Sequence, residues 1–465
     1  MSADTAARVY SHAERMRVVF GILTCLLLMA LDQTVVLPAI PQIASSLHGH
    51  AHLSWVVSAY LLTTTATTPI YGKLSDQLGR RVVLAPALLI FLGACVVCAQ
   101  AGSVPWLIAG RALQGLGGGA LGAVAQAAVA DVVPPRERGR YQAWFAGTWA
   151  FASVAGPVVG GFITQHFSWR WIFWGNLPLG LLAMGLSWRG LRGLRPAGGR
   201  ARIDYAGAGL LMGSVTLLLL GLSAGGVNFA WRSPQEMGVF ALAALGGAAL
   251  AAQQRRAPAP LLPGALLQRA RFVAAIGLLN SAAMFSAIFL LPLLLQKRYH
   301  VSPGLAGLQM VPFLFATTVG AFTAGRITRR TGLVKPVLAV ALCISTTGFG
   351  LLALPHAHNG VDQVVAFSAL AGLGLGGLMP TTLVAVQSLA GPAEIGAMTG
   401  ILLLVRAIGG AFGATLAGVA LTMTRHHPAA GFEGGFLAGA VLLLAALALA
   451  LRMAEIRLRT AVSTG

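Results

Sequence analysis

The sequence predicts an all-α protein that crosses a membrane many times. Of its 465 residues, 57% are hydrophobic and only 9% are charged, and the mean hydropathy is +0.78. Soluble globular proteins carry about 25% charged residues. Repeated apolar segments reach the roughly 20 residues that a helix needs to span a bilayer. Basic residues concentrate in alternate short loops between these segments, as the positive-inside rule predicts.

About fourteen segments satisfy this length, and their boundaries are good to a few residues. They lie near residues 17–40, 53–72, 82–101, 105–130, 141–165, 171–188, 205–225, 236–253, 272–296, 304–325, 336–355, 363–389, 397–422 and 433–452. An even number of spans with both termini in the cytoplasm puts most Lys and Arg inside. The inner loop near 390–396 is the exception, because it has Glu394 and no basic residue. The net charge of +20 therefore indicates membrane topology, and we expect no binding to nucleic acid.

The loop after the second span reads GKLSDQLGRR from Gly72 to Arg81. Its charges and turn could not be satisfied in hydrocarbon, so it must lie at a water interface. A weaker copy, GRITRRTG, spans residues 325–332 about eight spans later and lacks the carboxylate. This offset predicts two six-helix bundles, residues 1–188 and 272–465, joined by a linker of two extra spans at 189–271. Related halves around a central site are common in secondary transporters.

Asp32 is the most informative single residue, because no other carboxylate is expected inside the hydrocarbon. A buried carboxylate costs several kcal/mol unless it is neutralised or paired, which makes it a candidate functional group. Burial favours its neutral form, so this side chain could take up and release protons. The alternative is a structural carboxylate held permanently in a hydrogen bond or ion pair.

Arg111, in the fourth expected span, is the candidate partner of Asp32. Counted at 1.5 Å per residue, it lies roughly 9 Å below the outer surface. Asp32 lies about as far from the outer end of the first span. The shared depth predicts an Asp–Arg pair, which could be either switchable or permanent.

The fifth expected span contains the sequence GPVVGG, in which Gly156, Pro157, Gly160 and Gly161 remove side chains and bend the helix. We interpret it as a hinge, with close helix packing as the alternative. Polar or aromatic residues on other spans could line a substrate cavity, although packing or interhelical hydrogen bonding explains each of them alone equally well or better. These cavity candidates are Gln33, Gln114, Asn280, Gln309, Phe313, Thr381, Gln387 and Arg406.

Other function classes find no support in the sequence. It contains no phosphate-binding loop, no metalloprotease motif and no nucleophile elbow, so we expect no enzyme and no ATPase module. The four cysteines lie in apolar segments and suit core packing better than redox or zinc chemistry. The histidines at 48, 50 and 52 are typical of a solvated loop. We therefore expect no metal and no cofactor.

These motifs together resemble the fourteen-span drug:proton antiporter branch of the major facilitator superfamily over nearly the whole chain. The loop 72–81, the stretch RALQGLGGG at 111–119 and the segment 156–161 are similar to three antiporter signatures. The run 31–41 and the stretches 169–173 and 176–180 are similar to patterns of the fourteen-span branch.

The resemblance implies an alternating-access transporter in the plasma or inner membrane, with a central cavity between the bundles. It implies that Asp76 and Arg80, with Asp131 and Arg138, form a cytoplasmic latch that includes Gly72, Gly79 and Arg81. Asp32 would then carry the proton and Arg111 would tune it.

The expected function is proton-coupled export of lipophilic small molecules by a monomer. The lack of further intramembrane acids favours neutral or monocationic cargo. A lipid, glycolipid or endogenous-metabolite exporter with the same fold is the alternative, and a non-transporting membrane receptor is a more distant one. A channel is disfavoured, because no filter ring is apparent.

Overall fold

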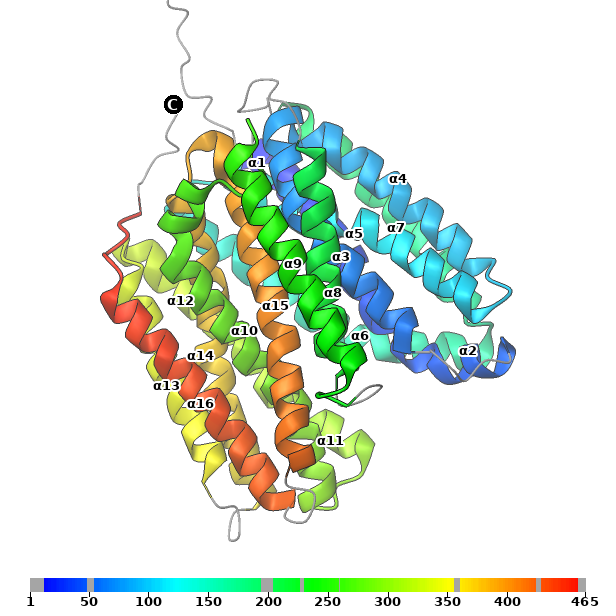
Figure 1. Ribbon diagram of the computed structural model, residues 1–465, viewed down its shortest axis with the longest axis vertical. Coiled ribbons are helices and arrows are strands. Elements are labelled where there is room, and N and C mark those ends of the chain that lie inside the picture. The colour runs from blue at the N-terminus through cyan, green and yellow to red at the C-terminus, as the bar shows by residue number, and fades with distance from the viewer. Residues whose placement is uncertain are drawn as a thin grey trace, which may run out of the picture.

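The computed structural model describes residues 12–47, 54–193, 204–225, 230–258, 260–354, 360–423 and 428–458, and their regular structure is entirely helical (Figure 1). Twelve helices in these ranges are long and apolar enough to cross a membrane. They are α1 (His12–Val35), α4 (Arg80–Ala99), α5 (Val104–Val132), α6 (Pro135–His166), α8 (Tyr205–Ala224), α9 (Pro234–Arg256), α10 (Gly264–Arg298), α12 (Val311–Thr331), α13 (Lys335–Ala353), α14 (Val361–Ser388), α15 (Ile395–Met423) and α16 (Pro428–Arg452).

The second and sixth expected spans are also helices, α3 (Ser54–Leu78) and α7 (Arg170–Gly190), but neither is among the twelve. Threonines lower the hydropathy of α3. Their hydroxyls are satisfied within the helix, as Thr67 donates to the Thr63 carbonyl at 2.7 Å and Thr68 to the Thr64 carbonyl at 2.7 Å. A polar helix of this kind is stable inside a bundle, because its side chains have partners there.

Prolines shift two of the expected boundaries. The first span was expected to run to residue 40, but α1 ends at Val35 and is followed by a 3-10 turn (Leu37–Ala39) and the short α2 (Ile40–Ser46). Pro38 has no backbone N–H to continue the hydrogen-bond ladder of α1, which explains the break. The tenth expected span is likewise divided into α11 (Pro303–Gln309) and α12, with Pro312 in the first turn of α12.

The long helices form two groups, each around its own buried apolar cluster. The first bundle, α1 and α3 to α7, encloses a cluster that includes Tyr60, Phe91 and Phe173. The second bundle, α10 and α12 to α16, encloses a cluster that includes Phe313, Phe349 and Phe436. The bundles meet along two seams, where α3 packs against α15 and α6 packs against α12.

The remaining two helices, α8 and α9, form a hairpin over the α3–α15 seam (Figure 1). Leu211, Val215 and Leu219 of α8 share a buried cluster with Leu62 of α3 and Leu404 of α15. The Thr415 hydroxyl of α15 also donates to the Leu222 carbonyl at 2.7 Å. The hairpin therefore contacts both bundles on one side of the molecule.

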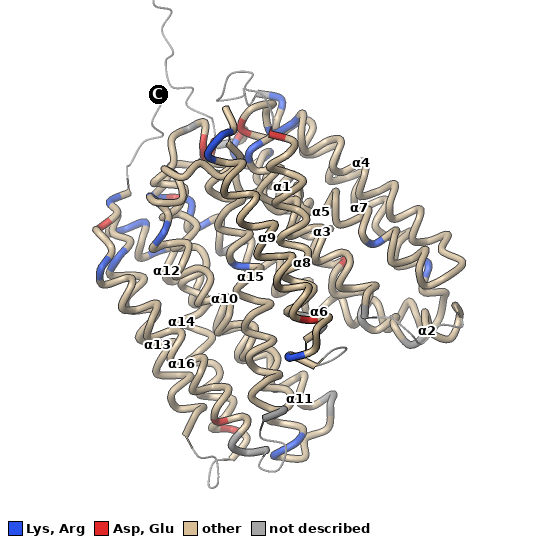
Figure 2. Tube along the Cα trace, in the orientation of Figure 1, with Lys and Arg blue, Asp and Glu red and all other residues tan. Residues whose placement is uncertain are grey.

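Lys and Arg gather at one end of the helices, around the α3–α4 turn and the α12–α13 turn (Figure 2). We call this the basic end, and it is defined by Lys73–Arg81 and Arg326–Lys335. The two glycine-containing loops of the sequence both lie here. Gly79 (φ 96°) and Gly332 (φ 71°) have the positive φ that favours glycine.

The first glycine of each loop lies on a seam between the bundles. A Cβ at Gly72 would overlap the carbonyl of Gly396 in α15, and a Cβ at Gly139 in α6 would lie 2.7 Å from the Cα of Gly325 in α12. Only glycine allows backbones to approach this closely. The two similar loops, 72–81 and 325–332, therefore lie at equivalent positions in the two halves of the fold.

Candidate functional site

Asp32 and Arg111 form an ion pair buried in the first bundle. The Arg111 Nη1 atom donates to Asp32 Oδ2 at 2.7 Å, and both residues are 1% exposed. The other carboxylate oxygen, Oδ1, accepts from the Gln114 amide at 2.9 Å and from the Asn176 amide at 2.8 Å. Charge-assisted hydrogen bonds of this kind are the strong ones, and together they compensate the desolvation of the carboxylate.

Arg111 also has partners that do not depend on Asp32. Its Nε donates to the Val56 carbonyl at 3.1 Å, and Nη1 donates to Gln114 Oε1 at 2.6 Å. The guanidinium carbon lies 4.3 Å from the centre of the Tyr60 ring, a distance typical of a cation–π contact. This polar cluster, which we call the Asp32 site, joins α1, α3, α5 and α7.

Asp32 lies beside Arg111, as their shared depth predicted, and three further neighbours of the pair were not predicted. Tyr60 lies under the guanidinium, Asn176 donates to the carboxylate, and Cys95 Sγ accepts from the Gln114 amide at 3.0 Å. Of these three, only Asn176 could be suspected from the sequence, because it is an amide inside an apolar helix. Gln114, a candidate for the substrate cavity, is fully buried and belongs to the Asp32 site.

The GPVVGG segment lies in α6, and two of its glycines face α1. A Cβ at Gly156 would overlap the Thr34 hydroxyl, and a Cβ at Gly160 would overlap the Val35 carbonyl. Gly161 has open space at its Cβ position, and Pro157 is exposed. One turn of α1 therefore carries both Asp32, which belongs to the Asp32 site, and Thr34, which contacts a glycine of α6.

At the basic end, Arg80 bridges two carboxylates. Its Nη1 lies 2.6 Å from Asp76 Oδ1, and its Nε and Nη2 donate to Asp131 at 2.8 and 3.2 Å. The Asp76 carboxylate also accepts hydrogen bonds from the backbone N–H groups of Gly396 and Ala397, both at 2.8 Å. We call Asp76, Arg80 and Asp131 the basic-end cluster. It connects α3 to the N-terminus of α15, where unpaired N–H groups and the helix dipole favour an anion.

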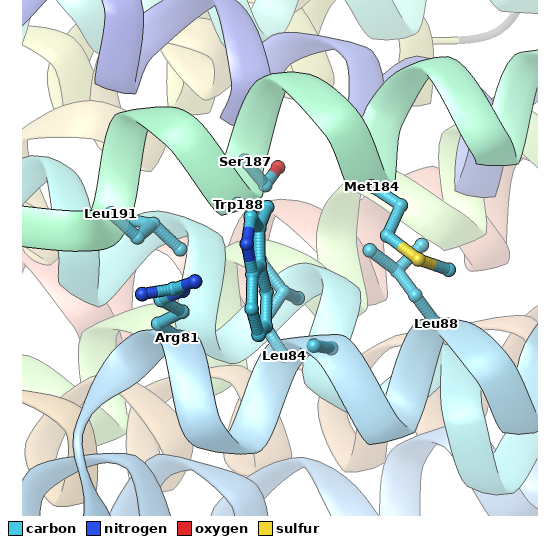
Figure 3. Close-up of a pocket in the computed structure, with 8 residues that line it drawn as sticks. Arg81, Leu84, Leu88, Met184, Ser187, Trp188 and Leu191 are labelled. Atoms are coloured by element: carbon cyan, nitrogen blue, oxygen red, sulfur yellow. The ribbon is translucent and has the colours of Figure 1, made fainter.

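Two further residues expected in the latch lie elsewhere. Arg138 is buried and donates to the carbonyls of Ala130 at 2.7 Å and Val133 at 3.0 Å, with no carboxylate within ion-pair distance among the described residues. Arg81 turns toward α7, where its guanidinium lies 3.4 Å from the centre of the Trp188 ring (Figure 3). The small cavity beside them, about 10 Å³, has room for about one water molecule.

The second bundle contains a buried cation without a carboxylate partner in the part of the chain that the structure describes. Arg406 of α15 donates through Nη2 to the Met379 carbonyl and the Thr382 hydroxyl, both at 2.5 Å, and its Nε has no partner there. Gly277 of α10 packs against this side chain. Asn280, one turn along α10, is 1% exposed, and neither of its amide atoms has a hydrogen-bond partner among the described residues.

The other cavity candidates divide into buried and half-buried residues. Phe313 is fully buried in the apolar cluster of the second bundle, and Thr381 donates to the Gly377 carbonyl at 2.7 Å. Gln387 donates to the Thr399 hydroxyl at 3.1 Å and to the Gln126 carbonyl of the first bundle at 3.4 Å. Gln33 and Gln309 are half-buried.

No group of three His, Cys, Asp or Glu in the described ranges could hold a metal ion. The histidines at 48, 50 and 52 lie outside those ranges.

The chain matches the family model "Major Facilitator Superfamily" over residues 22–414 and 273–462. It is 34% identical over 412 residues to the multidrug transporter protein MdtP of Bacillus subtilis, covering 88% of this chain and 76% of that protein. It is also 34% identical over 379 residues to the efflux pump dotC of Dothistroma septosporum, covering 79% of this chain and 64% of that protein.

Solved structures share the fold at low sequence identity. The human organic anion transporter MFSD10 aligns with a TM-score of 0.68 at 19% identity, covering 94% of this chain and 99% of that chain. The proton:xylose symporter XylE aligns with a TM-score of 0.65 at 16% identity, covering 96% and 98%. The family match covers well over half of the chain, and the helical bundle carries no enzymatic motif. The chain is a multi-pass membrane transporter that belongs to the major facilitator superfamily.

Proposed function

We propose that this protein is a proton-coupled antiporter that exports lipophilic small molecules by alternating access, with Asp32 as the proton carrier. The observation that carries the proposal is the buried Asp32–Arg111 pair, a titratable carboxylate at membrane depth. The names of the relatives, a multidrug transporter and efflux pumps, support export as the direction. A proton that enters down a potential of 100 mV releases about 2.3 kcal/mol. That sustains roughly a fifty-fold concentration ratio of a neutral substrate.

The partners of Arg111 support a switchable pair over a permanent one. Protonation of Asp32 would remove its attraction for Arg111. The guanidinium would still have the Val56 carbonyl, Gln114 Oε1 and the Tyr60 ring. Because the cation keeps these contacts, neutralising Asp32 costs less than it would for a buried arginine with no other partner.

The position of Asp32 on α1 links protonation to helix movement in this proposal. Thr34, two residues further on, donates to the Ala152 carbonyl of α6 at 2.9 Å and packs on Gly156. A shift of α1 away from α5 and α7 would therefore change its contact with α6. The segment 156–161 would act as the hinge, because it lacks side chains where α1 crosses it.

Counting α3 and α7 with the twelve apolar helices would give fourteen spans. The basic end would lie in the cytoplasm, and an even number of spans would then put both termini inside as well. The proposed domains are the first bundle within 1–188, the hairpin within 189–271 and the second bundle within 272–465. The contacts of Asp76 with α15, and of Gly72 with Gly396, hold the bundles together at this end. We propose that they form the latch of an outward-facing state in a monomer in the plasma or inner membrane.

The proposed test uses the protein in liposomes with an imposed pH gradient and ethidium as a lipophilic cationic dye. Wild type is expected to accumulate dye only with the gradient. Asp32→Asn is expected to lose gradient-driven accumulation and to retain exchange of dye for dye without a gradient. Asp204→Asn, a charge removal in the α8–α9 hairpin, serves as the control and should behave as wild type.

Each other outcome has a distinct meaning. Gradient-driven transport by Asp32→Asn would show that the proton carrier lies elsewhere. Loss of exchange as well, in a protein that elutes as a single species, would assign Asp32 a structural role. If wild type moves no dye, labelled lipids become the next cargo to test.

A further inference from the structure

A second polar site lies on the α6–α12 seam at the basic end, away from the Asp32 site. A cavity of about 290 Å³ is lined by three arginines, two aromatic residues and a glycine: Arg140 and Trp144 of α6 with Phe322, Gly325, Arg326 and Arg329 of α12. We call it the seam pocket. Its residues come from both bundles.

The three arginines of the seam pocket have no counter-charge among the described residues. None of them is within 4.0 Å of an Asp or Glu oxygen in the described part of the chain. The Arg140 guanidinium lies 5.7 Å from the centre of the Trp144 ring. Three guanidinium groups around one cavity attract an anion strongly. Their planar donor arrays match a phosphate, because a guanidinium can donate two parallel hydrogen bonds to phosphate oxygens.

The pocket lies beside a close approach of the two bundles. Arg140 follows Gly139, and Arg326 follows Gly325, the two glycines whose backbones are in contact. The α8–α9 hairpin covers the α3–α15 seam, and it makes no such contact with α6 or α12. A ligand in the seam pocket would therefore bind both bundles at once.

Two exposed apolar stripes lead away from the pocket toward the far end. On α6, Trp144 is followed at seven-residue intervals by Phe151, 60% exposed, and Val158, 68% exposed. On α12, Phe322, 47% exposed, is preceded by Phe315, 67% exposed. Seven residues make about two helical turns, so each stripe stays on one face of its helix.

We propose that the seam pocket binds the headgroup phosphate of an anionic phospholipid, whose acyl chains lie along these two stripes. Basic pockets between membrane helices at the cytoplasmic surface recognise lipid headgroups through this combination of charge and adjoining apolar surface. The bound lipid bridges Arg140 of the first bundle to Arg326 and Arg329 of the second, so it stabilises the state that is closed at the basic end. This inference rests on the proposed cytoplasmic placement of the basic end and holds for any cargo other than the lipid itself.

The experiment measures the thermal stability of the full chain in detergent with added lipids of identical acyl chains. Phosphatidylglycerol is expected to raise the melting temperature more than phosphatidylcholine, which carries no net charge. Arg326→Gln combined with Arg329→Gln is expected to weaken phosphatidylglycerol binding roughly thirtyfold, since each basic contact is worth about 1 kcal/mol. Arg330→Gln is the matched control, because this exposed arginine of α12 does not line the pocket, and it should bind as wild type does.

Four results would overturn the proposal. They are equal effects of the two lipids, equal loss of binding in Arg330→Gln, the full effect from inorganic phosphate alone, and movement of labelled phosphatidylglycerol across the bilayer by wild type. The third would make the pocket a site for a free anion, and the fourth would make the lipid a cargo. Unaltered melting of the double variant without lipid shows that it is folded; if it fails to fold, Arg140→Gln replaces it in the same measurements.

Discussion

The carboxylate of Asp76 in α3 accepts a hydrogen bond of 2.8 Å from the backbone N–H of Gly396 in α15, across the seam between the two bundles. A second bond, from the N–H of Ala397, makes Asp76 the cap of a helix that belongs to the other half of the protein. In the proposed alternating-access cycle this contact would exist only while the basic end is closed. Its loss on opening would then make it a determinant of the balance between the two proposed states.

Asp76→Asn should shift this balance toward the state that is open at the basic end. An amide carries no charge for the α15 dipole and can accept at only one of its two polar atoms, so about 1–2 kcal/mol is lost. The closed-to-open ratio then falls roughly five- to thirtyfold. Distances between spin labels at position 73 in α3 and at the exposed position 268 in α10, in a background with the exposed Cys343 replaced, report the change. The control is Glu394→Asp, just before α15, which keeps the charge of this side chain. If it shifts the label distances as much as Asp76→Asn does, Asp76 is not the cap that holds the seam closed.

Gly72→Ala should separate the same seam by steric overlap. The new methyl group would meet the Gly396 carbonyl, which is backbone and cannot rotate away. Overpacking of this kind costs about 1–3 kcal/mol. Gly93→Ala in α4 is the control, because its Cβ position is open. Thermal unfolding of the two variants should differ clearly, and equal melting temperatures would show that α3 and α15 can move apart without cost.

Gly160→Ala should impair transport, while Gly161→Ala should not. A methyl group at Gly160 would push α6 away from the Val35 carbonyl of α1, whereas the position at Gly161 is open. The expected loss of stability for Gly160→Ala is about 1–3 kcal/mol. Dye exchange in liposomes compares the two variants at equal protein amounts. Similar rates would contradict a role for the α1–α6 contact in transport.

Asn176→Leu should destabilise the protein, whereas Asn280→Leu should not. Asn176 donates to the Asp32 carboxylate, so its loss should destabilise the protein by about 1.5–3 kcal/mol. The amide of Asn280 has no partner among the described residues, so leucine there should be neutral or stabilising. Denaturation of each variant in detergent measures this difference. Reduced transport by a stable Asn280→Leu variant would indicate that its amide contacts cargo, and destabilisation by this change would show that the amide is satisfied.

Arg406→Gln should change which dyes are transported. The guanidinium has no carboxylate partner within the described ranges, so it favours an anionic or acceptor-rich group nearby and disfavours multivalent cations. Removing the charge should lower transport of an anionic dye relative to ethidium. Arg406→Lys keeps the charge and should retain the preference. If Arg406→Gln transports the anionic dye and ethidium in the same ratio as wild type, the cargo does not bind near Arg406.

The helices themselves were largely determined by the sequence, because segment length and hydropathy are local properties. A helix lies at every expected position, and the prolines at 38 and 312 account for the breaks at the end of the first span and within the tenth. The repeated glycine loop was also visible, since a positive φ at Gly79 and Gly332 requires a residue without a side chain. Depth along two antiparallel helices was enough to predict that Asp32 and Arg111 could meet.

The rotation of each helix and its neighbours were decided only by the tertiary structure. Arg80 and Arg81 are adjacent in the sequence, yet Arg80 binds Asp76 and Asp131 while Arg81 stacks on Trp188. The partner of Asp76 is the N-terminus of α15, which has no side-chain signal because the donors are backbone N–H groups. The position of the α8–α9 hairpin over one seam, and the open arginine pocket on the other, likewise depend on which apolar faces meet. Hydrophobic composition specifies that a helix is buried in a membrane, but only packing against its neighbours specifies which face it presents to them.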